Sequence, residues 1–499
     1  MRLDELARAV PGASVVRGAD AEVRRVVYDS RRAQPGDLFV AIPGARHDGA
    51  TFAADALARG ATGIVAERAP ELPSDAALVV VPIARRALGD LANALYGFPS
   101  EHLRVIGVTG TDGKTTTSHL IGQVLAAAGR RVGWLTTVDM RIGDEVIPNP
   151  FGHTTPEAAD VHEALARLVT AGVEDAVVEV SSHALALERV RGLSVDAAVF
   201  TNLAPEHLNF HGSMAEYAAA KAQLFAMLGE PTRKEWLRFG VVNADDPYAP
   251  AMVQASTVGI VSYALDFAAD VTAVNVRERL DGTHFLLVTP LGEYPVETRM
   301  VGLHNVMNWL AAASVALGFG IDMEAVVEAA ATAEPPRGRL ERIEQGQPFE
   351  VVVDFAHTPQ ALETTLAALR RLTHGKLYLV FGMAGERDAS NRPVMGELAA
   401  KLSDFFVISS DDPGPEDPAA IAAEVAAGAR GTGALEGTDY VIDLDRRSAV
   451  ASVIQRARPG DAILLAGKGH ERRMVLADGS VPWSDQDAAR EALAAGGWK

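Results

Sequence analysis

The segment 103-LRVIGVTGTDGKTTTSHLIGQVLAAAG-129 decides the fold of this chain. Its first part predicts a buried strand that ends at a glycine, and its last part predicts an Ala- and Leu-rich helix. Between them, Gly110 and Gly113 allow backbone conformations that point N–H groups toward phosphate oxygens. Lys114 can reach the outer phosphates of a nucleotide, and the Thr115 hydroxyl can bind Mg²⁺. The segment therefore predicts a phosphate-binding loop at a helix N-terminus, where the helix dipole favours negative charge.

The match to the general pattern of such loops is imperfect. Val108 stands where that pattern has a glycine, six positions before the lysine. The alternative is an ordinary strand-to-helix turn that contains glycine. The Gly-Lys-Thr sequence, the strand before it and the helix after it together favour phosphate binding.

Strand-like and helical segments alternate on both sides of this loop. From about residue 102 to 335, the runs RVGWLT, DAVVEVSS, DAAVFTNL and FGVVNADD alternate with helical segments such as VHEALARLV. This alternation predicts βαβ units and a largely parallel sheet. The Pro- and Gly-rich segment TAEPPRGRLE at 332–341 predicts a linker. After it, the runs EVVVDFAH, KLYLVFGM, DFFVISSDD, DYVIDL and DAILLAGKG predict a second, doubly wound sheet.

The first hundred residues contain the shorter runs VVYDSRR, GDLFVAIPG and GATGIVAE, which predict a small α/β domain. The fold class is therefore α/β with three domains. We expect a small N-terminal domain at 1–101, a central phosphate-loop domain with a parallel sheet at 102–335, and a Rossmann-like domain at 336–499. Ligands of such sheets bind outside the carboxyl ends of the strands.

Composition excludes several classes of protein. The chain has 499 residues, a formal net charge of −19 and no cysteine. The absence of cysteine excludes disulfides, zinc–thiolate sites and cysteine nucleophiles. The acidic balance argues against a nucleic-acid partner. No apolar run is long enough to cross a membrane, and the start lacks the apolar centre of a signal peptide. We expect a soluble, cytoplasmic monomer without a membrane partner.

The loop TGTDGKTTT and a series of landmarks along the chain resemble the Mur ligase family. The landmarks are EVSSHAL, TNLAPEHLNFHG, YAAAKAQLF, LHNVMNWLAA, GRLE, DFAHTP and GKGHE, and they occur in order over nearly the whole chain. The resemblance is strongest to the members that add the third residue of the peptidoglycan stem to UDP-N-acetylmuramoyl-L-Ala-D-Glu. It implies an ATP-dependent ligase that forms an acyl phosphate, with the UDP-muramoyl dipeptide and a free amino acid as its partners.

The resemblance implies that Mg²⁺ accompanies ATP and assigns it a set of ligands. Glu179 and His207 both follow predicted strands, and the matching lysine of the family, Lys221 here, is carbamylated by CO₂. Taken alone, Glu179 is a surface or capping residue, His207 a hydrogen-bonded structural histidine and Lys221 a solvated lysine. His211 is a further candidate that could equally pack against its neighbours. The implied metal ligands are Thr115, Glu179, His207 and Lys221, and the implied catalytic residues are Lys114, Lys221, Glu179, His207 and Arg339.

The resemblance also implies the nucleotide contacts. Asn305 matches the position that contacts adenine, Arg339 a cation that reaches the γ-phosphate when domains close, and Asp354 the ribose contact. Without the family pattern, Arg339 could form a linker salt bridge and Asp354 could cap a helix. The implied ATP-binding residues are Gly110, Thr111, Asp112, Gly113, Lys114, Thr115, Thr116, Asn305, Arg339 and Asp354.

The implied substrate contacts fall in two groups. Hydroxyls and arginines suit the anionic UDP-muramoyl peptide, although each could be an ordinary polar loop residue. The residues matched to that substrate are Ser30, Ala45, Arg46, His47, Thr154, Thr155, Ser181 and Arg189. The residues matched to the incoming amino acid are Arg387, Asp411, Asp412, Pro413, Gly414, Gly467 and Glu471.

The amino-acid site departs from the family at 411–414. Members that add diaminopimelate have Asp-Asn-Pro-Arg there, whereas this chain has Asp-Asp-Pro-Gly. An arginine can pair with the distal carboxylate of diaminopimelate, and Gly414 cannot. Asp412 should repel that carboxylate and attract an ammonium group. We therefore expect L-lysine or L-ornithine as the substrate, with meso-diaminopimelate as the alternative if another arginine, such as Arg392 or Arg472, approaches the site.

Three other functions compete with this prediction. A folate polyglutamate ligase is disfavoured because about 100 residues precede the phosphate loop. The ligase that adds D-Ala-D-Ala is closer, but GERD at 385–388, the Asp-Asp-Pro-Gly segment and GKGHE favour the third-residue enzyme. A nucleotide-dependent switch or motor belongs to a different class, and it would release phosphate without a UDP-dipeptide and an amino acid.

Overall fold

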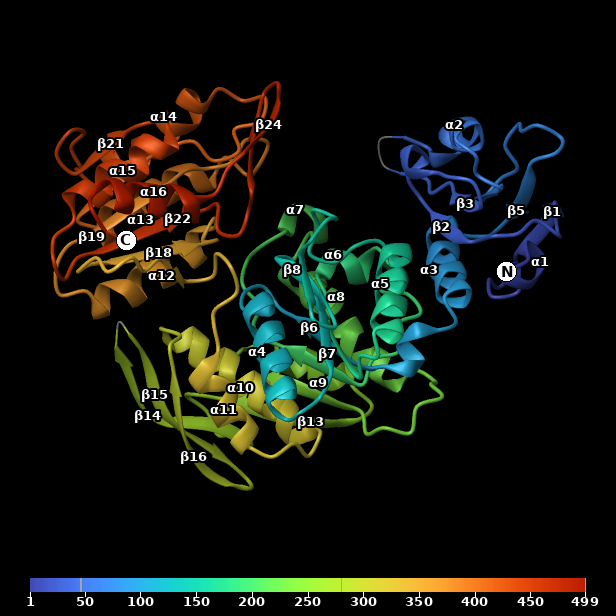
Figure 1. Ribbon diagram of the computed structural model, residues 1–499, viewed down its shortest axis with the longest axis horizontal. Helices are drawn as coiled ribbons and strands as arrows, with labels where there is room; N and C mark the ends of the chain where they lie inside the picture. The colour runs from blue at the N-terminus through green and yellow to red at the C-terminus, as the bar shows by residue number, and fades with distance from the viewer. Residues whose placement is uncertain (45–46, 280, 499) are drawn as a thin grey trace. The chain divides into compact units, whose positions relative to one another are not determined.

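The computed structural model describes residues 1–44, 47–279 and 281–498 (Figure 1). Contacts within the chain divide it into two compact units. The first unit comprises residues 1–272, 289–291 and 308–326. The second comprises residues 273–288, 292–307 and 327–499.

The N-terminal part of the first unit is a five-stranded sheet in the order β1-β5-β4-β3-β2. Pairs among β2, β3, β4 and β5 are parallel, and β1 pairs with β5 in the antiparallel direction. The predicted small α/β domain is thus confirmed. Its elements are α1 (Leu3–Ala7), β1 (Ser14–Arg17), β2 (Arg25–Val27), η1 (Ser30–Arg32), β3 (Asp37–Val40), η2 (Gly49–Phe52), α2 (Ala53–Ala58), β4 (Gly63–Ala66), β5 (Ala77–Val80) and α3 (Ala84–Leu95).

A second sheet of the first unit contains strands in the order β13-β12-β11-β6-β10-β7-β8-β9. The pairs of β6 with β10 and β11 are parallel, as the alternating pattern predicts, and the edge hairpin β8–β9 is antiparallel. The elements are η3 (Pro99–His102), β6 (Arg104–Thr109), α4 (Lys114–Ala127), β7 (Val132–Leu135), β8 (Asp139–Ile142), β9 (Glu145–Pro148), α5 (Ala158–Thr170), β10 (Asp175–Glu179), α6 (Ser182–Ala186), β11 (Ala197–Phe200), α7 (Leu208–His211), α8 (Met214–Ala226), η4 (Met227–Gly229), β12 (Phe239–Asn243), α9 (Ala249–Ala255) and β13 (Gly259–Ala264).

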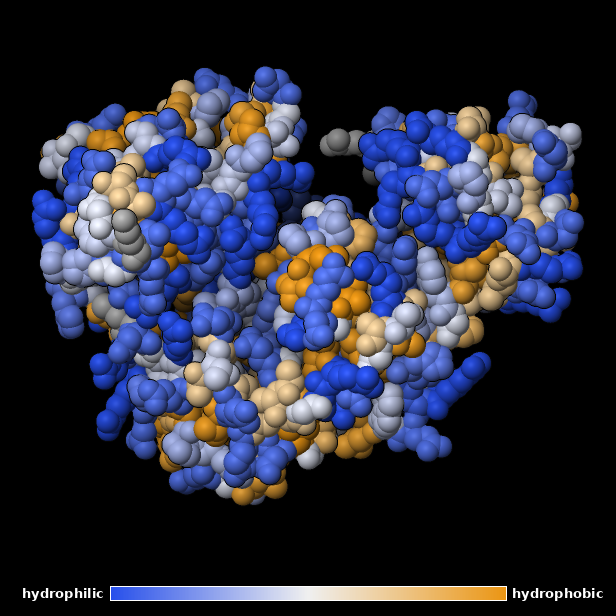
Figure 2. All heavy atoms as spheres, in the orientation of Figure 1, coloured by the Kyte–Doolittle hydropathy of each residue, from blue (hydrophilic) through white to orange (hydrophobic). Residues whose placement is uncertain are grey.

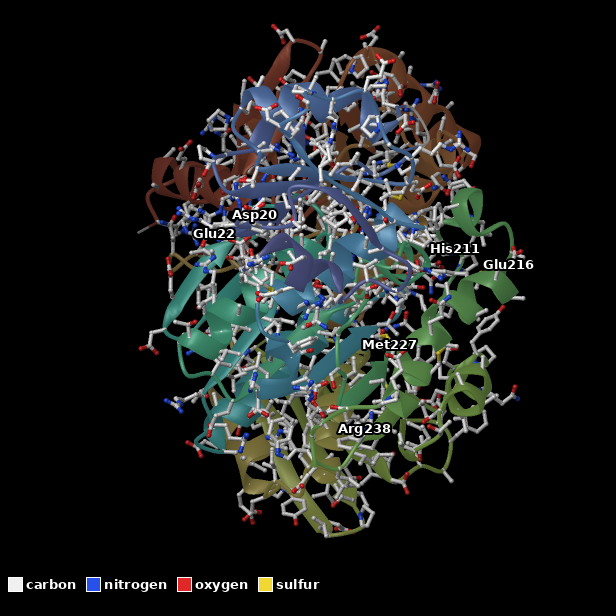
Figure 3. All side chains as sticks on the ribbon, turned by 90° about the vertical axis from the view of Figure 1, so that its right-hand side faces the viewer. Asp20, Glu22, His211, Glu216, Met227 and Arg238 are labelled. Atoms are coloured by element: carbon white, nitrogen blue, oxygen red, sulfur yellow. The ribbon has the colours of Figure 1, made fainter. Side chains whose placement is uncertain are left out.

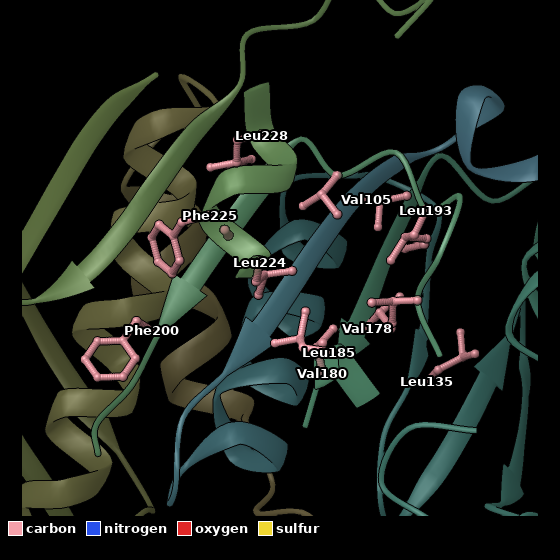
Figure 4. Packing of buried hydrophobic residues seen from close by; sticks show 14 of the residues in the cluster. Val105, Leu135, Val178, Val180, Leu185, Leu193, Phe200, Leu224, Phe225 and Leu228 are labelled. Carbon is pink, nitrogen blue, oxygen red and sulfur yellow. The ribbon is translucent and has the colours of Figure 1, made fainter. Parts of the chain in front are cut away.

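The core of this sheet lies between its central strands and the helices that cover them (Figure 4). Val105 and Val178 come from neighbouring parallel strands, while Leu224 and Phe225 come from α8. All four are fully buried. The central residues of β6 and β10 are buried and carry no charge, as is typical of parallel strands covered by helices on both faces.

A hydrogen bond and ion pairs join the N-terminal part of the first unit to the segments that surround its central sheet. The Tyr28 hydroxyl donates to Asp160 Oδ2 at 2.7 Å, and Arg32 Nη2 donates to Asp160 Oδ1 at 3.1 Å. Asp160 is buried on α5, so this carboxylate links η1 and the residue that follows β2 to that helix. Arg191 pairs with Asp90 of α3 in the same way, at 2.8 Å.

The second unit contains a six-stranded sheet in the order β17-β18-β22-β19-β20-β21, in which β18, β22, β19, β20 and β21 are parallel. This confirms the second doubly wound sheet. Its elements are β17 (Glu341–Arg342), β18 (Glu350–Asp354), α12 (Pro359–Leu372), β19 (Leu377–Phe381), α13 (Asn391–Leu402), β20 (Phe405–Ile408), α14 (Pro418–Gly431), β21 (Tyr440–Ile442), α15 (Arg446–Arg456), β22 (Ala462–Ala466), the antiparallel hairpin β23 (Arg473–Leu476) and β24 (Gly479–Pro482), and α16 (Asp485–Ala495).

Several elements were not predicted from the sequence. The strands β14 (Val271–Arg279), β15 (Gly282–Thr289) and β16 (Gly292–Thr298) are neighbours in that order. The helices α10 (Leu303–Gly318) and α11 (Glu324–Thr332) follow, and both cross the division between the units. Figure 2 shows hydrophobic side chains around the edge hairpin of the central sheet, where Val146 is exposed. Among the residues described, no helix is both long and apolar enough to span a bilayer.

Candidate active site

The predicted phosphate loop joins β6 to α4, and α4 begins at Lys114. Gly110 and Gly113 have φ angles of +151° and +81°. A Cβ atom on Gly110 would lie 1.8 Å from Thr201 Oγ1, and one on Gly113 would lie 2.5 Å from Asn308 Oδ1. Both positions therefore require glycine for space as well as for backbone conformation.

The end of β11 holds the loop in place. The Asp112 N–H donates to Asn202 Oδ1 at 2.9 Å, and the Thr201 hydroxyl donates to the Asp112 carbonyl at 2.6 Å. On the other side, the Thr117 hydroxyl donates to Asn308 of α10 at 3.0 Å. Sequence analysis missed Thr201, Asn202 and Asn308, although Thr201 and Asn202 open the landmark TNLAPEHLNFHG at the end of a predicted strand.

Thr115 and Glu179 form the acidic part of the site. The Thr115 hydroxyl donates to Glu179 Oε2 at 3.0 Å. The Thr137 N–H and hydroxyl also donate to this carboxylate, each at 2.9 Å. Glu179 is buried at the end of β10, so it is neither a surface residue nor a helix cap. A buried carboxylate beside a hydroxyl supplies the oxygen ligands that Mg²⁺ prefers, so these residues fit that ion.

Two lysines lie at this loop. Lys114 Nζ donates to the Thr111 carbonyl at 2.5 Å, and Lys221 Nζ donates to the Gly110 carbonyl at 2.6 Å. Lys221 is only 1 % exposed on α8, with its Nζ 4.5 Å from the centre of the Tyr217 ring. Burial, and next the charge of Lys114, hold the pKa of Lys221 well below its ordinary value. Lys221 is thus a buried lysine with a weakened preference for the charged form, and not a solvated one.

Three histidines gather on the side of Lys221. The ring centre of His183 lies 4.6 Å from that of His207 and 5.5 Å from that of His211. Burial, His207 and His211 lower the pKa of His183 to about 4. His207 has a left-handed φ of +56° just before α7 and lies 3.7 Å from Glu206. His211 makes a 3.0 Å hydrogen bond with the Ser182 hydroxyl and lies close to Glu216 in Figure 3.

The polar residues matched to the muramoyl peptide cluster at the carboxyl end of β10. The Thr155 hydroxyl donates to the Glu179 carbonyl at 2.9 Å and accepts from the Ser181 N–H at 3.0 Å. Arg189 Nη1 donates to the Thr155 carbonyl at 3.3 Å, and its Nε lies 3.0 Å from Glu157. The structure therefore brings Thr155, Ser181 and Arg189 together beside the acidic part of the site, and Thr154 joins them through the Thr137 hydroxyl at 3.1 Å.

The residues matched to uridine belong to the N-terminal part. Ser30 is buried at the start of η1, and its hydrogen bond lowers the pKa of Asp55. His47 is exposed, and its ring lies edge-on to Phe52 at 6.1 Å between centres. The predicted contacts Ala45 and Arg46 lie outside the described residues.

Three residues matched to ATP lie in the second unit. The Arg339 guanidinium packs over the Phe355 ring at 4.7 Å. Asp354 ends β18 and accepts the Leu340 N–H at 2.7 Å. Burial raises the pKa of Asp354, and the nearby Arg339 opposes this shift. Asn305 lies on α10, where its side-chain amide donates to the Val301 carbonyl at 2.8 Å.

Three of the residues matched to the amino acid, Asp411, Asp412 and Glu471, lie around a buried lysine. Lys468 Nζ donates to Asp412 Oδ1 at 2.8 Å and also to Glu471, and it lies 3.7 Å from Asp411. Sequence analysis did not single out Lys468, although it lies within the landmark GKGHE. Because Lys468 already pairs with Asp412, that carboxylate is not an uncompensated charge. The expectation that Asp412 by itself repels a distal carboxylate is therefore weakened.

The surrounding backbone positions this cluster. The Val475 N–H donates to Asp412 Oδ1 at 2.8 Å, which ties the cluster to β23. Gly467 has a φ of +101°, and a Cβ there would lie 2.2 Å from Asp411 Oδ2. Gly414 has a φ of +57°, and a Cβ there would meet no atom within 4 Å. Pro413 lies between Asp412 and Gly414 in the sequence, and its carbonyl accepts the Glu416 N–H at 3.1 Å.

The arginines of this region differ in exposure. Arg387 is exposed in the segment that follows β19. Arg392 is buried and pairs with Glu416 and Glu424 at 2.8 and 3.0 Å. Its guanidinium is therefore engaged with two carboxylates of this chain and does not stand in for the arginine that is missing at 414.

Three ranges of the chain match domains of a known protein family. Residues 22–96 match the Mur ligase family catalytic domain, residues 108–316 the Mur ligase middle domain, and residues 338–469 the Mur ligase glutamate ligase domain. These ranges fall within the three expected domains. The chain belongs to the Mur ligase family of ATP-dependent ligases.

Two curated relatives cover nearly the whole chain. The UDP-N-acetylmuramoyl-L-alanyl-D-glutamate–2,6-diaminopimelate ligase of Geobacillus thermodenitrificans is 41% identical over 493 residues, which is 99% of each chain. The UDP-N-acetylmuramyl-tripeptide synthetase of a Roseiflexus species is 42% identical over 507 residues, also 99% of each. A solved structure of a UDP-N-acetylmuramoyl-L-alanyl-D-glutamate–2,6-diaminopimelate ligase matches with a TM-score of 0.69 and 30% identity over all of both chains.

Proposed function

We propose that this chain joins the third amino acid of the stem peptide to UDP-N-acetylmuramoyl-L-Ala-D-Glu at the expense of ATP. The observation that supports it most is the 3.0 Å hydrogen bond between Thr115 and Glu179, at the phosphate loop that Lys221 also contacts and within the range that matches the Mur ligase middle domain. The names of the two curated relatives, tripeptide synthetase and diaminopimelate ligase, support the same step.

The proposed reaction has two steps. First, an oxygen of the D-Glu γ-carboxylate attacks the γ-phosphorus of ATP, the bond to the bridging oxygen breaks, and ADP leaves with an acyl phosphate formed. Second, the α-amine of the amino acid attacks the acyl carbon, loses a proton, and phosphate leaves as the amide forms. Lys114 and Arg339 contribute positive charge toward the transferring phosphoryl group.

Mg²⁺ fits the oxygen-rich group formed by Thr115, Glu179 and, once carbamylated, Lys221, with His207 as a further ligand. When bound, the ion would screen the charge of the phosphates. Carbamylation would convert the Lys221 amine into an anionic oxygen donor. The lowered pKa of Lys221 supports this proposal because only the neutral amine adds CO₂.

The incoming amino acid is either meso-diaminopimelate or one of the basic amino acids L-lysine and L-ornithine. The names of the relatives support meso-diaminopimelate better than L-lysine or L-ornithine. One local feature favours the basic amino acids: Gly414 offers no side chain to pair with a distal carboxylate. The pairing of Asp412 with Lys468 removes much of the electrostatic argument for them.

The experiment supplies purified protein with ATP, Mg²⁺, the UDP-dipeptide and one amino acid at a time from meso-diaminopimelate, L-lysine and L-ornithine. Product is identified by mass, and phosphate release is followed in the same reaction. We expect release only when both the dipeptide and a suitable amino acid are present. Phosphate release that needs neither would favour a nucleotide-dependent switch and contradict the proposal. We also retain a cytoplasmic location and the domain boundaries 1–101, 102–335 and 336–499 as proposals.

A further inference from the structure

Lys468 has an unusual position for a lysine in the second unit. Its side chain is completely buried, and its ammonium lies among the carboxylates of Asp411, Asp412 and Glu471. Oxygen atoms of these three carboxylates lie within 4.8 Å of one another. One ammonium group therefore faces three acids that the family resemblance matches to the amino-acid substrate.

The cluster is built with fixed geometry. Asp412 has a left-handed φ of +41°, which is uncommon for a residue other than glycine. Its carboxylate oxygen Oδ1 accepts two hydrogen bonds of 2.8 Å, one from Lys468 Nζ and one from the Val475 N–H. Glu471 lies three residues after Lys468 and pairs with the same ammonium. Removing Lys468 would therefore free both carboxylates at once.

The electrostatics of the cluster agree with this arrangement. Burial lowers the pKa of Lys468, but Asp411, Glu471 and Asp412 outweigh burial and raise the pKa above its ordinary value. Burial raises the pKa of Glu471 and of Asp411, and Lys468 opposes the shift in both. The contacts thus favour the charged form of Lys468, and its ammonium opposes the upward pKa shift that burial causes in Asp411 and Glu471.

We propose that Lys468 is a positioning residue that orients Asp412 and Glu471 and sets the charge that the incoming amino acid's side chain meets. This inference rests on the proposed function, because it assigns Lys468 to the amino-acid site of that reaction. A side chain that ends in an ammonium must share the carboxylates with Lys468, whereas a distal carboxylate benefits from the resident cation. Lys468 therefore weakens the preference of the site for L-lysine or L-ornithine and favours diaminopimelate.

The test is a charge series at the cluster. Lys468→Met makes the cluster one unit more negative, Asp412→Asn makes it one unit less negative, and the double variant restores the original charge. The readout is the ratio of kcat/KM for L-lysine or L-ornithine to kcat/KM for meso-diaminopimelate. A change of one charge in the cluster, next to the side chain of the bound amino acid and partly shielded from water, should shift this ratio about tenfold. We expect a rise in Lys468→Met, a fall in Asp412→Asn, and a return to within about threefold in the double variant.

Lys401→Met is the matched control, because Lys401 lies exposed on α13 of the same unit. It should leave the ratio unchanged, and none of the variants should change KM for ATP by more than about twofold. Thermal unfolding checks that each variant is folded. If Lys468→Met does not fold, Asp412→Asn and the double variant still decide the outcome.

Calorimetric binding of the same amino acids to the protein with the UDP-dipeptide gives the ratio without turnover. Ratios that stay within about threefold of each other across the series would overturn the role of Lys468 while leaving the ligase activity standing. Wild-type protein that ligates none of these amino acids would instead contradict the proposed function.

Discussion

The Thr115 hydroxyl, at the start of the phosphate-loop helix, donates a 3.0 Å hydrogen bond to the buried carboxylate of Glu179 at the end of a neighbouring strand. Because β6 and β10 are paired in parallel, both groups lie at the same edge of the sheet. The pair therefore joins the phosphate loop to the position where oxygen ligands for Mg²⁺ are needed.

Glu179→Gln should keep the hydrogen bond with Thr115 and remove the negative charge of the side chain. We expect kcat to fall at least about a hundredfold, because an amide binds Mg²⁺ far less well than a carboxylate, and the Mg²⁺ concentration needed for half-maximal rate to rise. Steady-state rates at varied Mg²⁺ measure both. The exposed residue Glu145, changed to Gln, is the control and should behave as wild type. Unchanged Mg²⁺ dependence in Glu179→Gln would contradict this role.

Lys221→Ala should abolish most activity, since it removes the amine that is proposed to carry the carbamate. We expect a loss of at least about a hundredfold and partial recovery when a small carboxylate or chloride is added, because these anions can replace the missing charge. In wild-type protein, ¹³C-bicarbonate should give a carbamate signal that Lys221→Ala lacks. A lack of recovery with any anion, together with no carbamate signal, would exclude carbamylation.

Gly110→Ala should disrupt the phosphate loop, because the added Cβ would lie 1.8 Å from Thr201 Oγ1. We expect KM for ATP to rise more than about tenfold, with a smaller loss of thermal stability. Gly129→Ala makes a suitable control: Gly129 also has a positive φ, of +78°, but its Cβ would meet no atom within 4 Å. Equal effects of the two substitutions on KM for ATP would show that the contact with Thr201 is unimportant.

His162 should make the first unit sensitive to acid. Burial lowers its pKa to about 4, and its Nε2 bonds the Arg191 carbonyl at 2.8 Å. The unfolded chain protonates this histidine near pH 6.5, so the unfolded state binds more protons between about pH 6.5 and 4, and stability falls as pH falls. From pH 7 to 5 this loss should be about 2 kcal/mol for wild type.

His162→Gln keeps a hydrogen-bond donor but has no group that titrates in this pH range. From pH 7 to pH 5, the free energy of unfolding of this variant should therefore fall by about 2 kcal/mol less than that of wild type. Denaturant unfolding at pH 7 and pH 5 measures the difference. The exposed residue His102, changed to Gln, should follow wild type. A parallel loss in wild type and His162→Gln would contradict the prediction.

The fold was largely predictable because parallel strands that are buried on both faces have nearly uninterrupted hydrophobic sequences, such as those of β11 and β22. The strand β14 was missed because its second half, including Asn275 and Arg277, is polar and lacks a strong alternating signal.

The phosphate loop was predictable because its glycines, lysine and threonines lie together in sequence. The residues that hold it, Asn202 and Asn308, lie in the landmarks TNLAPEHLNFHG and LHNVMNWLAA, but these segments are distant in sequence and only the fold shows their contact with the loop. Lys468 was missed for a related reason: a lysine in a motif is expected to be solvated, and only tertiary structure shows the three carboxylates around it.

Transfer of oxygen from the substrate to phosphate tests the central claim most directly. The UDP-dipeptide is labelled with ¹⁸O in the γ-carboxylate of D-Glu, and the phosphate released during ligation is analysed by mass. If ATP activates that carboxylate, each phosphate should contain one ¹⁸O atom and the tripeptide should retain the other. Phosphate free of ¹⁸O, formed while ATP is consumed, would contradict the account.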